Sequence, residues 1–218
     1  MAASSPRTSF SSPKLLRLLD GLGVADVDVS KLSFAERLGQ WMDITDSISL
    51  SAALKANVAG KDVPAGGDMA AELARVRKTL TDSILAEKGL RVAEAADFTP
   101  FHRYHTGLQR DMEAGIGALR AKVRAALTGR SPSQGRLAAL DAALEQSLQD
   151  KERNFLATVP WLLEKRFNHL RKADQEASGW LEPFRREMQE ILLAELDLRL
   201  QPVEGLVEAL SNEVTKHP

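Results

Sequence analysis

The chain has 218 residues, of which 44% are hydrophobic and 27% charged, and its formal net charge is −1. This hydrophobic fraction excludes a wholly disordered chain, and the balance of charge argues against a protein whose main task is to coat nucleic acid. The absence of cysteine excludes disulfides, thiolate catalysis and cysteine-ligated zinc. Aromatic residues are few, and residues with high helix propensity are abundant, so the composition predicts an all-α fold.

Residues 1–11 are small, polar and rich in serine, and they are predicted to form a disordered leader. This segment lacks the apolar core of a secretory signal, and no window approaches the roughly 20 apolar residues of a membrane span. We therefore expect a cytoplasmic protein with no integral membrane insertion.

An N-terminal helical hairpin is predicted over residues 12–59. Its first helix starts at Ser12-Pro13, where a capping hydroxyl precedes a proline, and is short and strongly apolar. A helix of this length is marginal alone, so we expect it to dock on the helix containing Trp41 or on another protomer. The candidate protein-interaction residues are Leu15, Leu16, Leu18, Leu19 and Trp41.

The second helix of the hairpin is predicted to begin at the capping box Ser33-Phe-Ala-Glu36 and to run to about Asn57. Its apolar positions follow helical spacing and predict a buried face. The residues of that face are Phe34, Leu38, Trp41, Ile44 or Thr45, Ile48 and Leu54. Residues 60–68, with Pro64 and three glycines, are interpreted as a linker to the rest of the chain.

Long helices at short spacing predict a bundle over residues 69–218. Helix is expected from 69 to about 94, from 99 to 128 after a Thr99-Pro100 cap, from 133 to 172, from 179 to 200, and from 203 to 213. Residues 129–135 are predicted to form a tight turn. Pro160 predicts a kink or break and Pro202 an interruption, because proline lacks the backbone donor. The fold class is therefore an elongated antiparallel helical bundle, or coiled-coil-like hairpins, with a small N-terminal helical subdomain.

The spacing of apolar residues also predicts the inward face of the first helix of the bundle. The first helix after the linker is expected to bury Leu73, Val76, Leu80, Ile84 and Leu85.

His102 and His105 lie three residues apart near a helix start, where both could face one direction. A metal site would need at least one further ligand, and no residue at a fixed local spacing supplies it. We interpret both as exposed helical histidines. No catalytic, cofactor-binding or metal-binding residue is predicted, because no serine or threonine lies near a base in the pattern that nucleophilic catalysis requires.

Positive charge concentrates in residues 101–136 and 151–172, whereas the sequence after Trp180 is acidic. The favoured interpretation is that basic and acidic helices face each other within one bundle or between protomers. The alternative is a nucleic-acid-associated protein in which Arg120, Lys122 and Arg124 contact phosphates. The basic segments lack the interleaved aromatic residues that stack on bases.

Three stretches carry a family resemblance: residues 9–19 (SFSSPKLLRLL), 33–41 (SFAERLGQW) and 46–54 (DSISLSAAL). The chain resembles a proteobacterial all-helical family known only as a domain of unknown function. Genes of that family lie beside genes for membrane proteins of the ion-driven motor and peptidoglycan-binding types. The resemblance therefore implies a cytoplasmic accessory of an envelope-anchored complex, and it brings no catalytic residues.

Taken with the apolar seams and the complementary charged helices, these patterns predict a non-enzymatic helical adaptor or scaffold for protein–protein assembly, expected to be a homo-oligomer. A nucleic-acid-associated protein is the second hypothesis. An enzyme with a site assembled between helices is the third.

Overall fold

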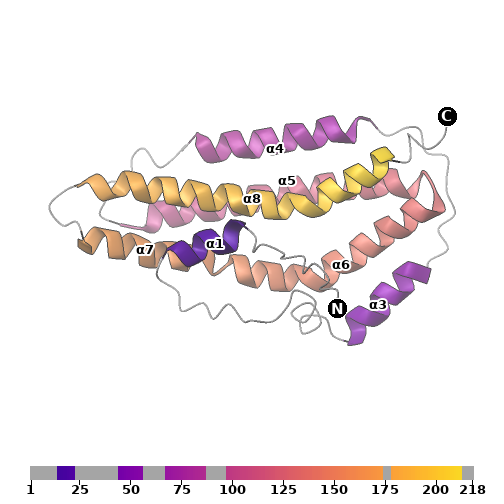
Figure 1. The fold of residues 1–218 in the computed structure, drawn as a ribbon, viewed down its shortest axis with the longest axis horizontal. Coiled ribbons are helices and arrows are strands. Elements are labelled where there is room, and N and C mark those ends of the chain that lie inside the picture. The colour runs from indigo at the N-terminus through magenta and orange to yellow at the C-terminus, as the bar shows by residue number, and fades with distance from the viewer. Residues whose placement is uncertain (1–13, 23–43, 56–66, 87–96, 174–177, 213–218) are drawn as a thin grey trace, which may run out of the picture.

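The computed structural model describes residues 14–22, 44–55, 67–86, 97–173 and 178–212 (Figure 1). Within these ranges every regular element is helical, which confirms the predicted all-α class. The helices are α1 (Lys14–Gly21), α3 (Ile44–Lys55), α4 (Met69–Leu85), α5 (Thr99–Thr128), α6 (Pro132–Leu156), α7 (Val159–Ala173) and α8 (Leu181–Asn212), and a 3₁₀ turn, η1 (Ser178–Trp180), precedes α8.

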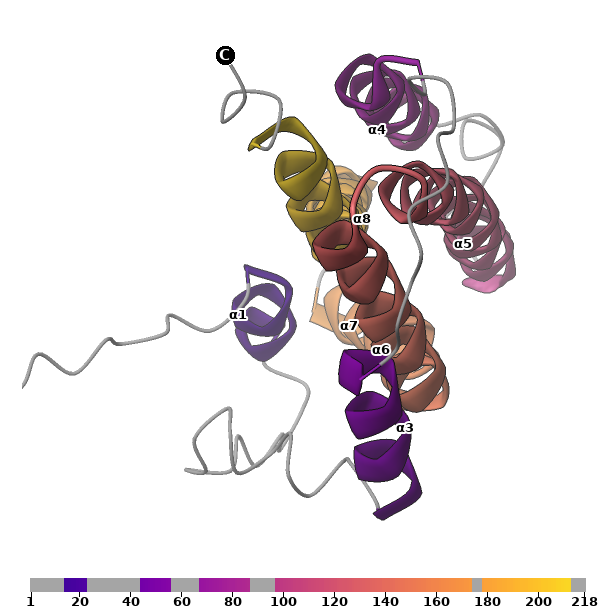
Figure 2. The same cartoon turned by 90° about the vertical axis from the view of Figure 1, so that its right-hand side faces the viewer.

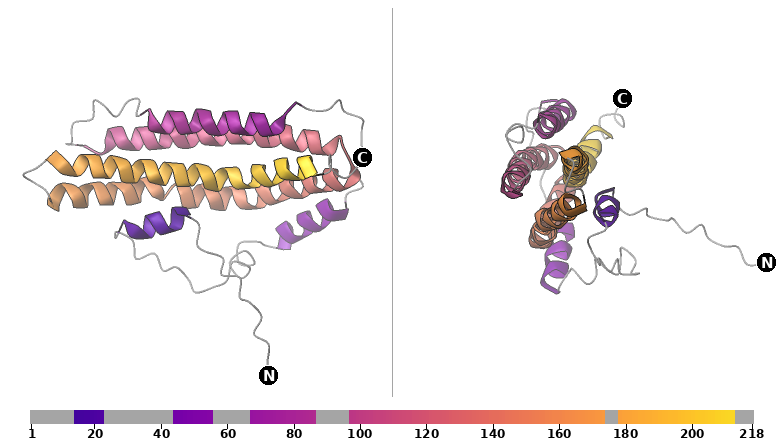
Figure 3. Two further views of the ribbon diagram at one scale, coloured as in Figure 1. Left: turned by 45° about the horizontal axis from the view of Figure 1, so that its top comes forward. Right: turned by 90° about the vertical axis from the view of Figure 1, so that its left-hand side faces the viewer.

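Four rods form an elongated antiparallel bundle: α4, α5, α6 followed by α7, and α8 (Figures 1 and 3). Successive rods run in opposite directions, as short connections between long helices dictate. The rods α5 and α8 pack on each other and form the centre; α4 covers both on one side, and α6 with α7 covers both on the other (Figure 2). The predicted elongated bundle is therefore confirmed.

The helix starts follow from local capping chemistry, with two corrections. The Asp68 carboxylate accepts a hydrogen bond from the Ala71 amide at 3.0 Å at the start of α4, and the Ser131 hydroxyl accepts from the Gln134 amide at the start of α6. Thr99 was expected to cap α5, but it lies inside the helix and its amide donates to Asp97 at 3.1 Å. The turn before α6 is also shorter than the predicted 129–135, because α6 already begins at Pro132, where the fixed φ of proline suits a first helical residue.

The helix α4 ends earlier than predicted. Its last residue is Leu85 and Ala86 is its C-cap, with the amide of Ala86 donating to the Asp82 carbonyl oxygen at 2.9 Å, whereas the pattern predicted helix to about residue 94; residues 87–96 lie outside the described residues. Leu80 and Ile84 are buried as predicted, but Leu85 is 53% exposed. Consecutive helical residues point about 100° apart, so Ile84 occupies the core position and Leu85 does not.

The two internal prolines have different outcomes. The predicted break at Pro160 is confirmed, because α6 ends at Leu156 and α7 begins at Val159. The predicted interruption at Pro202 is wrong, since α8 continues through it to Asn212. An internal proline costs a helix roughly 3 kcal/mol, and burial of Leu200 and Val203 on either side of the exposed Pro202 holds both halves of α8 in the bundle.

An aromatic cluster closes the end of the bundle where α5 and α8 begin. It consists of Phe98, Phe101, Phe167, Trp180 and Phe184, all buried. The closest pair, Phe167 and Trp180, meets edge to face with ring centroids 4.9 Å apart, a favoured geometry for aromatic rings. From this cluster an aliphatic core continues along the facing sides of α5, α7 and α8.

The described parts of the predicted N-terminal hairpin pack on different rods. α1 lies against α8 and α3 lies against α6, and the two helices are well separated in Figure 3. They are therefore not paired as the two arms of one hairpin. Phe34, Leu38 and Trp41 lie outside the described residues. Ile48 and Leu54, predicted to be buried, are 64% and 57% exposed, whereas Leu50 and Ala53 of the same helix are half-buried.

Substitution of two leucines, one buried and one exposed, tests which residues form the core. Leu163 on α7 is fully buried, whereas Leu85 is half exposed. We expect Leu163→Ala to lower the free energy of unfolding by about 2–5 kcal/mol, through lost burial and the cavity left behind. Leu85→Ala should lower it by less than about 1 kcal/mol. Chemical denaturation of both variants measures this difference, and equal losses would contradict the packing described above.

Candidate functional site

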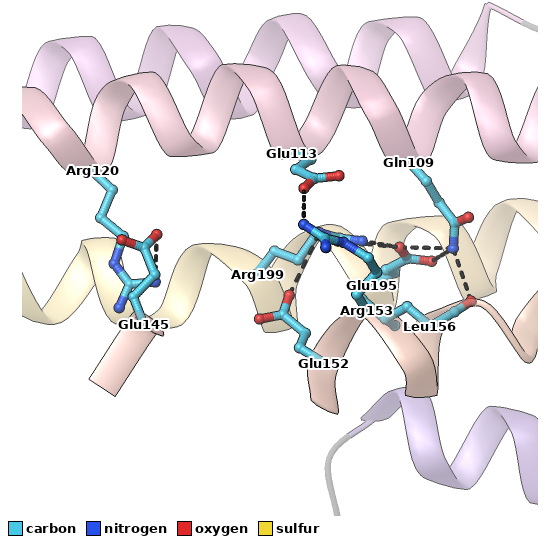
Figure 4. Close-up of polar contacts among 9 residues, drawn as sticks. All are labelled: Gln109, Glu113, Arg120, Glu145, Glu152, Arg153, Leu156, Glu195 and Arg199. Atoms are coloured by element: carbon cyan, nitrogen blue, oxygen red, sulfur yellow. Dashed lines mark hydrogen bonds and ion pairs between the residues drawn. The ribbon is translucent and has the colours of Figure 1, made fainter. Parts of the chain in front are cut away.

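A cluster of polar side chains lies in the middle of the bundle, where α5, α6 and α8 meet (Figure 4). We call it the central polar cluster: His105 and Gln109 of α5, Glu152 of α6, which is exposed at its edge, and Glu195 and Arg199 of α8. His105 and Glu195 are 0% exposed and Arg199 is nearly buried. Burying such groups costs free energy unless they are paired, so their partners decide what the cluster does.

The two fully buried members occupy core positions of their helices. His105 continues a stripe of buried residues at three- and four-residue steps along α5, which contains Phe101, Leu108, Met112, Ile116, Leu119, Val123 and Leu127. Glu195 lies on α8 among the buried Ile191, Leu192, Ala194 and Leu196. Helical periodicity therefore carries both side chains into the interior.

Glu195 is the centre of the hydrogen bonds in the cluster. The Gln109 amide donates to both carboxylate oxygens of Glu195 at 3.1 Å. Arg199, one turn further along α8, donates to the same carboxylate through Nε at 3.1 Å and Nη2 at 3.0 Å. Nη1 of Arg199 lies 3.5 Å from Glu152 of α6. These contacts join the three helices through one buried carboxylate.

The break in the third rod supplies a further acceptor for the cluster. In a continuous helix the amide of residue 160 would donate to the carbonyl of Leu156, but Pro160 has no amide hydrogen. The Gln109 side chain donates to that carbonyl oxygen at 3.2 Å. A single amide group of α5 thus satisfies both the carbonyl released by the proline of α7 and the buried acid of α8.

His105 corrects the prediction that both histidines are exposed. His102 is exposed, but His105 is buried, because only residue 105 lies on the core stripe of α5. Neither ring nitrogen of His105 has a hydrogen-bond partner among the described residues, and Nε2 lies 4.0 Å from Glu195. Among the described residues no group of three or more histidine, aspartate or glutamate side chains could hold a metal ion.

Burial sets the protonation of both groups. Removal from water, together with the positive charges of His102 and Arg199, lowers the pKa of His105 to about 3, so the imidazole is neutral at pH 7. Burial raises the pKa of Glu195, against the opposing effects of Arg199 and Gln109. Solvent is excluded from both groups in this conformation. The role of the cluster is therefore to hold three helices together.

A second polar network links α5 to α6 nearer the other end of the bundle. Arg120 forms a bidentate ion pair with Asp141 at 2.6 and 2.8 Å and also reaches Glu145 at 3.3 Å. Arg124 lies 2.5 Å from Glu145 and 3.3 Å from Asp141. Asp141 is buried and Arg120 nearly so, so each charge depends on its partner.

Other ion pairs connect the remaining rods. Lys122 pairs with Glu72 of α4, and Arg77 of α4 pairs with Asp197 and Glu204 of α8. Arg166 of α7 holds Glu187 of α8 in a bidentate pair at 2.6 and 2.8 Å. The favoured interpretation, that basic and acidic helices face each other, is confirmed for the pair Arg166–Glu187, which joins the segment 151–172 to the acidic sequence after Trp180. The partners of Arg120, Lys122 and Arg124 lie on α6 and α4, however, and not on the acidic C-terminal helix.

With this geometry in hand, the chain can be compared with known proteins. Residues 1–212 match the family described as Protein of unknown function (DUF3348). The chain belongs to the DUF3348 family. No curated protein and no solved structure gives a significant match to it. In the part of this DUF3348 protein that the structure describes, no helix is both long and apolar enough to cross a membrane.

The candidate interaction residues of this DUF3348 protein are already used within the chain. Leu15 and Leu19 are buried and Leu16 and Leu18 half-buried in the contact of α1 with α8. A partner could reach them only if α1 left α8. Trp41 lies outside the described residues, so the predicted contact of α1 with its helix stays a prediction.

An open hollow of ≈ 600 Å³ lies between the end of α4 and the start of α5. Its lining mixes Asp82 and Asp111 with Arg103, and Asp82 pairs with Lys78 at 2.7 Å. The Tyr104 hydroxyl donates to the last carbonyls of α4, at 2.7 Å to that of Ile84. These contacts join α4 to α5. They do not indicate a ligand for the hollow.

The buried His105 predicts a pH dependence of stability. Its pKa is lower in the folded protein than the ordinary 6.5, so between pH 6.5 and about 3 the unfolded chain binds more protons. The free energy of unfolding should therefore fall as the pH falls through this window, by up to ~1.4 kcal/mol per pH unit. Glu195 acts in the opposite direction, because a raised pKa favours the folded state at low pH.

The contribution of His105 can be isolated by substitution. We expect His105→Gln to flatten the dependence on pH between 6.5 and 4, while His102→Gln, at an exposed position of the same helix, leaves it as in the wild type. Urea denaturation at several pH values measures the slopes. An unchanged slope in His105→Gln would show that this histidine is already protonated in the folded protein.

The second network predicts a large cost for the loss of one cation. Arg120→Gln leaves Asp141 buried beside one weaker partner, so we expect the free energy of unfolding to fall by roughly 3–5 kcal/mol. Arg110→Gln, at an exposed position of the same helix, should change it by less than about 0.5 kcal/mol. Guanidinium denaturation compares the two variants, and a fully stable Arg120→Gln protein would contradict the structural role of this arginine.

Proposed function

We propose that this DUF3348 protein is a non-enzymatic helical adaptor that binds a helix of another protein through the outer face of α3. One observation carries the proposal: α3 is fixed on α6 by one face, while Ile48 and Leu54 remain largely exposed on the helix. Large apolar side chains on a positioned surface helix are typical anchors of protein–protein interfaces.

The composition of α3 favours a helix as the bound partner. Its charged residues are confined to Asp46 near the start and Lys55 at the end. Between them the exposed positions carry small side chains, Ser47, Ser49 and Ala52, beside the two anchors. Small residues next to large apolar ones let a second helix approach closely and bury the anchors without desolvating charge.

The charges of the bundle support protein binding over nucleic-acid binding. In the segment 101–136, Arg120, Lys122 and Arg124 all have acidic partners. In the segment 151–172, Arg166 is paired with Glu187, and Lys165 lies over the exposed Trp161 ring at 3.6 Å. The charges of Arg120, Lys122, Arg124 and Arg166, which are paired with carboxylates, contribute little field for phosphates.

The cellular setting is proposed from the family resemblance alone. A helical adaptor in the cytoplasm would serve as an accessory of an envelope-anchored complex, and the partner helix would then belong to that complex. This part of the proposal is independent of the α3 surface, because the same surface could bind a partner in any compartment.

A pair of variants tests the adaptor role. Affinity purification from native cells, with quantitative mass spectrometry, is carried out on the wild type, on Ile48→Ser/Leu54→Ser, and on Leu85→Ser. Loss of two interface anchors should reduce the retained partner at least tenfold. Leu85→Ser is matched in chemistry and exposure but lies on α4, and it should retain the partner. The interaction is then remeasured with the purified partner.

The contrary outcomes are distinct. Equal retention by all three proteins would remove α3 as the binding surface. Sub-micromolar binding of a fluorescent oligonucleotide near 150 mM salt would favour the nucleic-acid hypothesis instead, because non-specific binding at such salt is usually no tighter than about 10⁻⁶ M.

A further inference from the structure

Among the described helices, α1 packs mainly on α8. It has eight residues, and Leu15, Leu19 and the following Leu22 are 1%, 3% and 4% exposed. Isolated helices shorter than about 12–15 residues are marginal in water, so α1 depends on the surface to which it binds. That surface is mainly α8.

The middle of α8 is buried over a continuous stretch that is apolar except for Glu195. Between Ile191 and Leu196 every residue except Leu193 is buried. In Figures 2 and 3, α1 lies on the side of α8 that faces away from α5. α1 thus covers a side of the central helix that the other rods leave open.

We infer that this side of α8 is a docking site for the α1 helix of a second copy of the chain, so that two copies can exchange α1. The two surfaces are complementary, because they are already in contact within one chain. Every copy carries both the short leucine helix and the surface that receives it. Exchange conserves each α1–α8 contact, which makes it a low-cost route to a dimer.

The spacing of the leucines fits this mode of docking. Leu15, Leu18, Leu19 and Leu22 lie at positions i, i+3, i+4 and i+7, the pattern by which an amphipathic helix inserts into an apolar groove. The exposed Lys14 and Arg17 lie off this stripe.

The length of the chain between α1 and α3 allows the exchange. Residues 23–43 separate the two helices, and 21 residues can span at most roughly 70 Å. A rod such as α8, with 32 residues, is about 48 Å long at 1.5 Å per residue. A neighbouring copy lying alongside is therefore within reach of α1 while α3 stays on its own α6.

The inference extends the proposed assembly role, but it uses a different surface, so either can fail alone. The first test is binding of a fluorescent peptide of residues 12–23 to the full-length chain. In the wild type the site is filled by the tethered α1, whose effective concentration is of millimolar order. The variant Leu15→Ser/Leu19→Ser empties the site and should bind the peptide at least tenfold more tightly than the wild type.

Two controls accompany this titration. Lys14→Ser/Arg17→Ser changes the same helix at exposed positions and should bind the peptide like the wild type. A peptide carrying both leucine substitutions should not bind to any chain. If the leucine variant is folded by circular dichroism and still fails to bind the wild-type peptide, the docking site does not exist as a separable surface.

The second test leaves the leucine contact intact. A photo-crosslinking amino acid replaces the half-buried Leu16, and equal amounts of ¹⁴N- and ¹⁵N-labelled full-length chains are refolded together at about 100 µM. In fully exchanged dimers about half of the α1–α8 cross-links should join chains of different label. Cross-links that join only chains of the same label would overturn the exchange. The residues of α3 are unchanged throughout, so this outcome does not bear on the adaptor surface.

Discussion

The missing amide hydrogen of Pro160 shapes the centre of this protein. It ends one helix at Leu156 and leaves a buried carbonyl oxygen without its usual donor. Gln109 donates to that oxygen and to Glu195, and Glu195 is held in turn by Arg199. One backbone defect is thereby converted into a connection among three rods. A buried polar network of this kind costs more to form than an apolar core, but it fixes which helices meet and in which register.

Charged residues also connect the rods of the bundle. Ion pairs join α4 to α5, α4 to α8, α5 to α6, and α7 to α8, so each rod of the bundle is linked to others by charge as well as by apolar packing. A near-neutral chain can therefore contain basic segments in which several cations are paired with carboxylates of neighbouring helices. The two surfaces proposed for partners are the outer face of α3 and, if α1 exchanges, the α1–α8 contact. A helix is the proposed occupant of both, so the two proposals describe the same kind of assembly.

Several predictions were wrong for the same physical reason. Neighbouring residues fit the helical pattern of a buried face equally well, but only one of them lies on that face. Leu85 comes directly after Ile84 in the sequence, and Ile48 and Leu54 fit the spacing of a buried face. These three residues are nevertheless exposed, because a neighbouring residue occupies the buried position. His102 and His105 look equivalent three residues apart, but only His105 continues the stripe from Phe101 to Leu108. That stripe was readable in the sequence and would have identified His105 as buried. Glu195 could likewise have been found as an acid inside an apolar run of α8.

The sequence by itself determined the helical class, the main helices of the bundle, the break at Pro160 and the opposite charge of the segments that later pair. These features depend on propensity, periodicity and local backbone chemistry, which act within a few residues. Only the tertiary structure decided that Pro202 is tolerated, that Arg120 and Arg124 meet Asp141 and Glu145, and that Gln109 serves both Leu156 and Glu195. Each of these outcomes depends on a residue far away in the chain. A local sequence pattern does not indicate which helix faces come into contact when the rods pack.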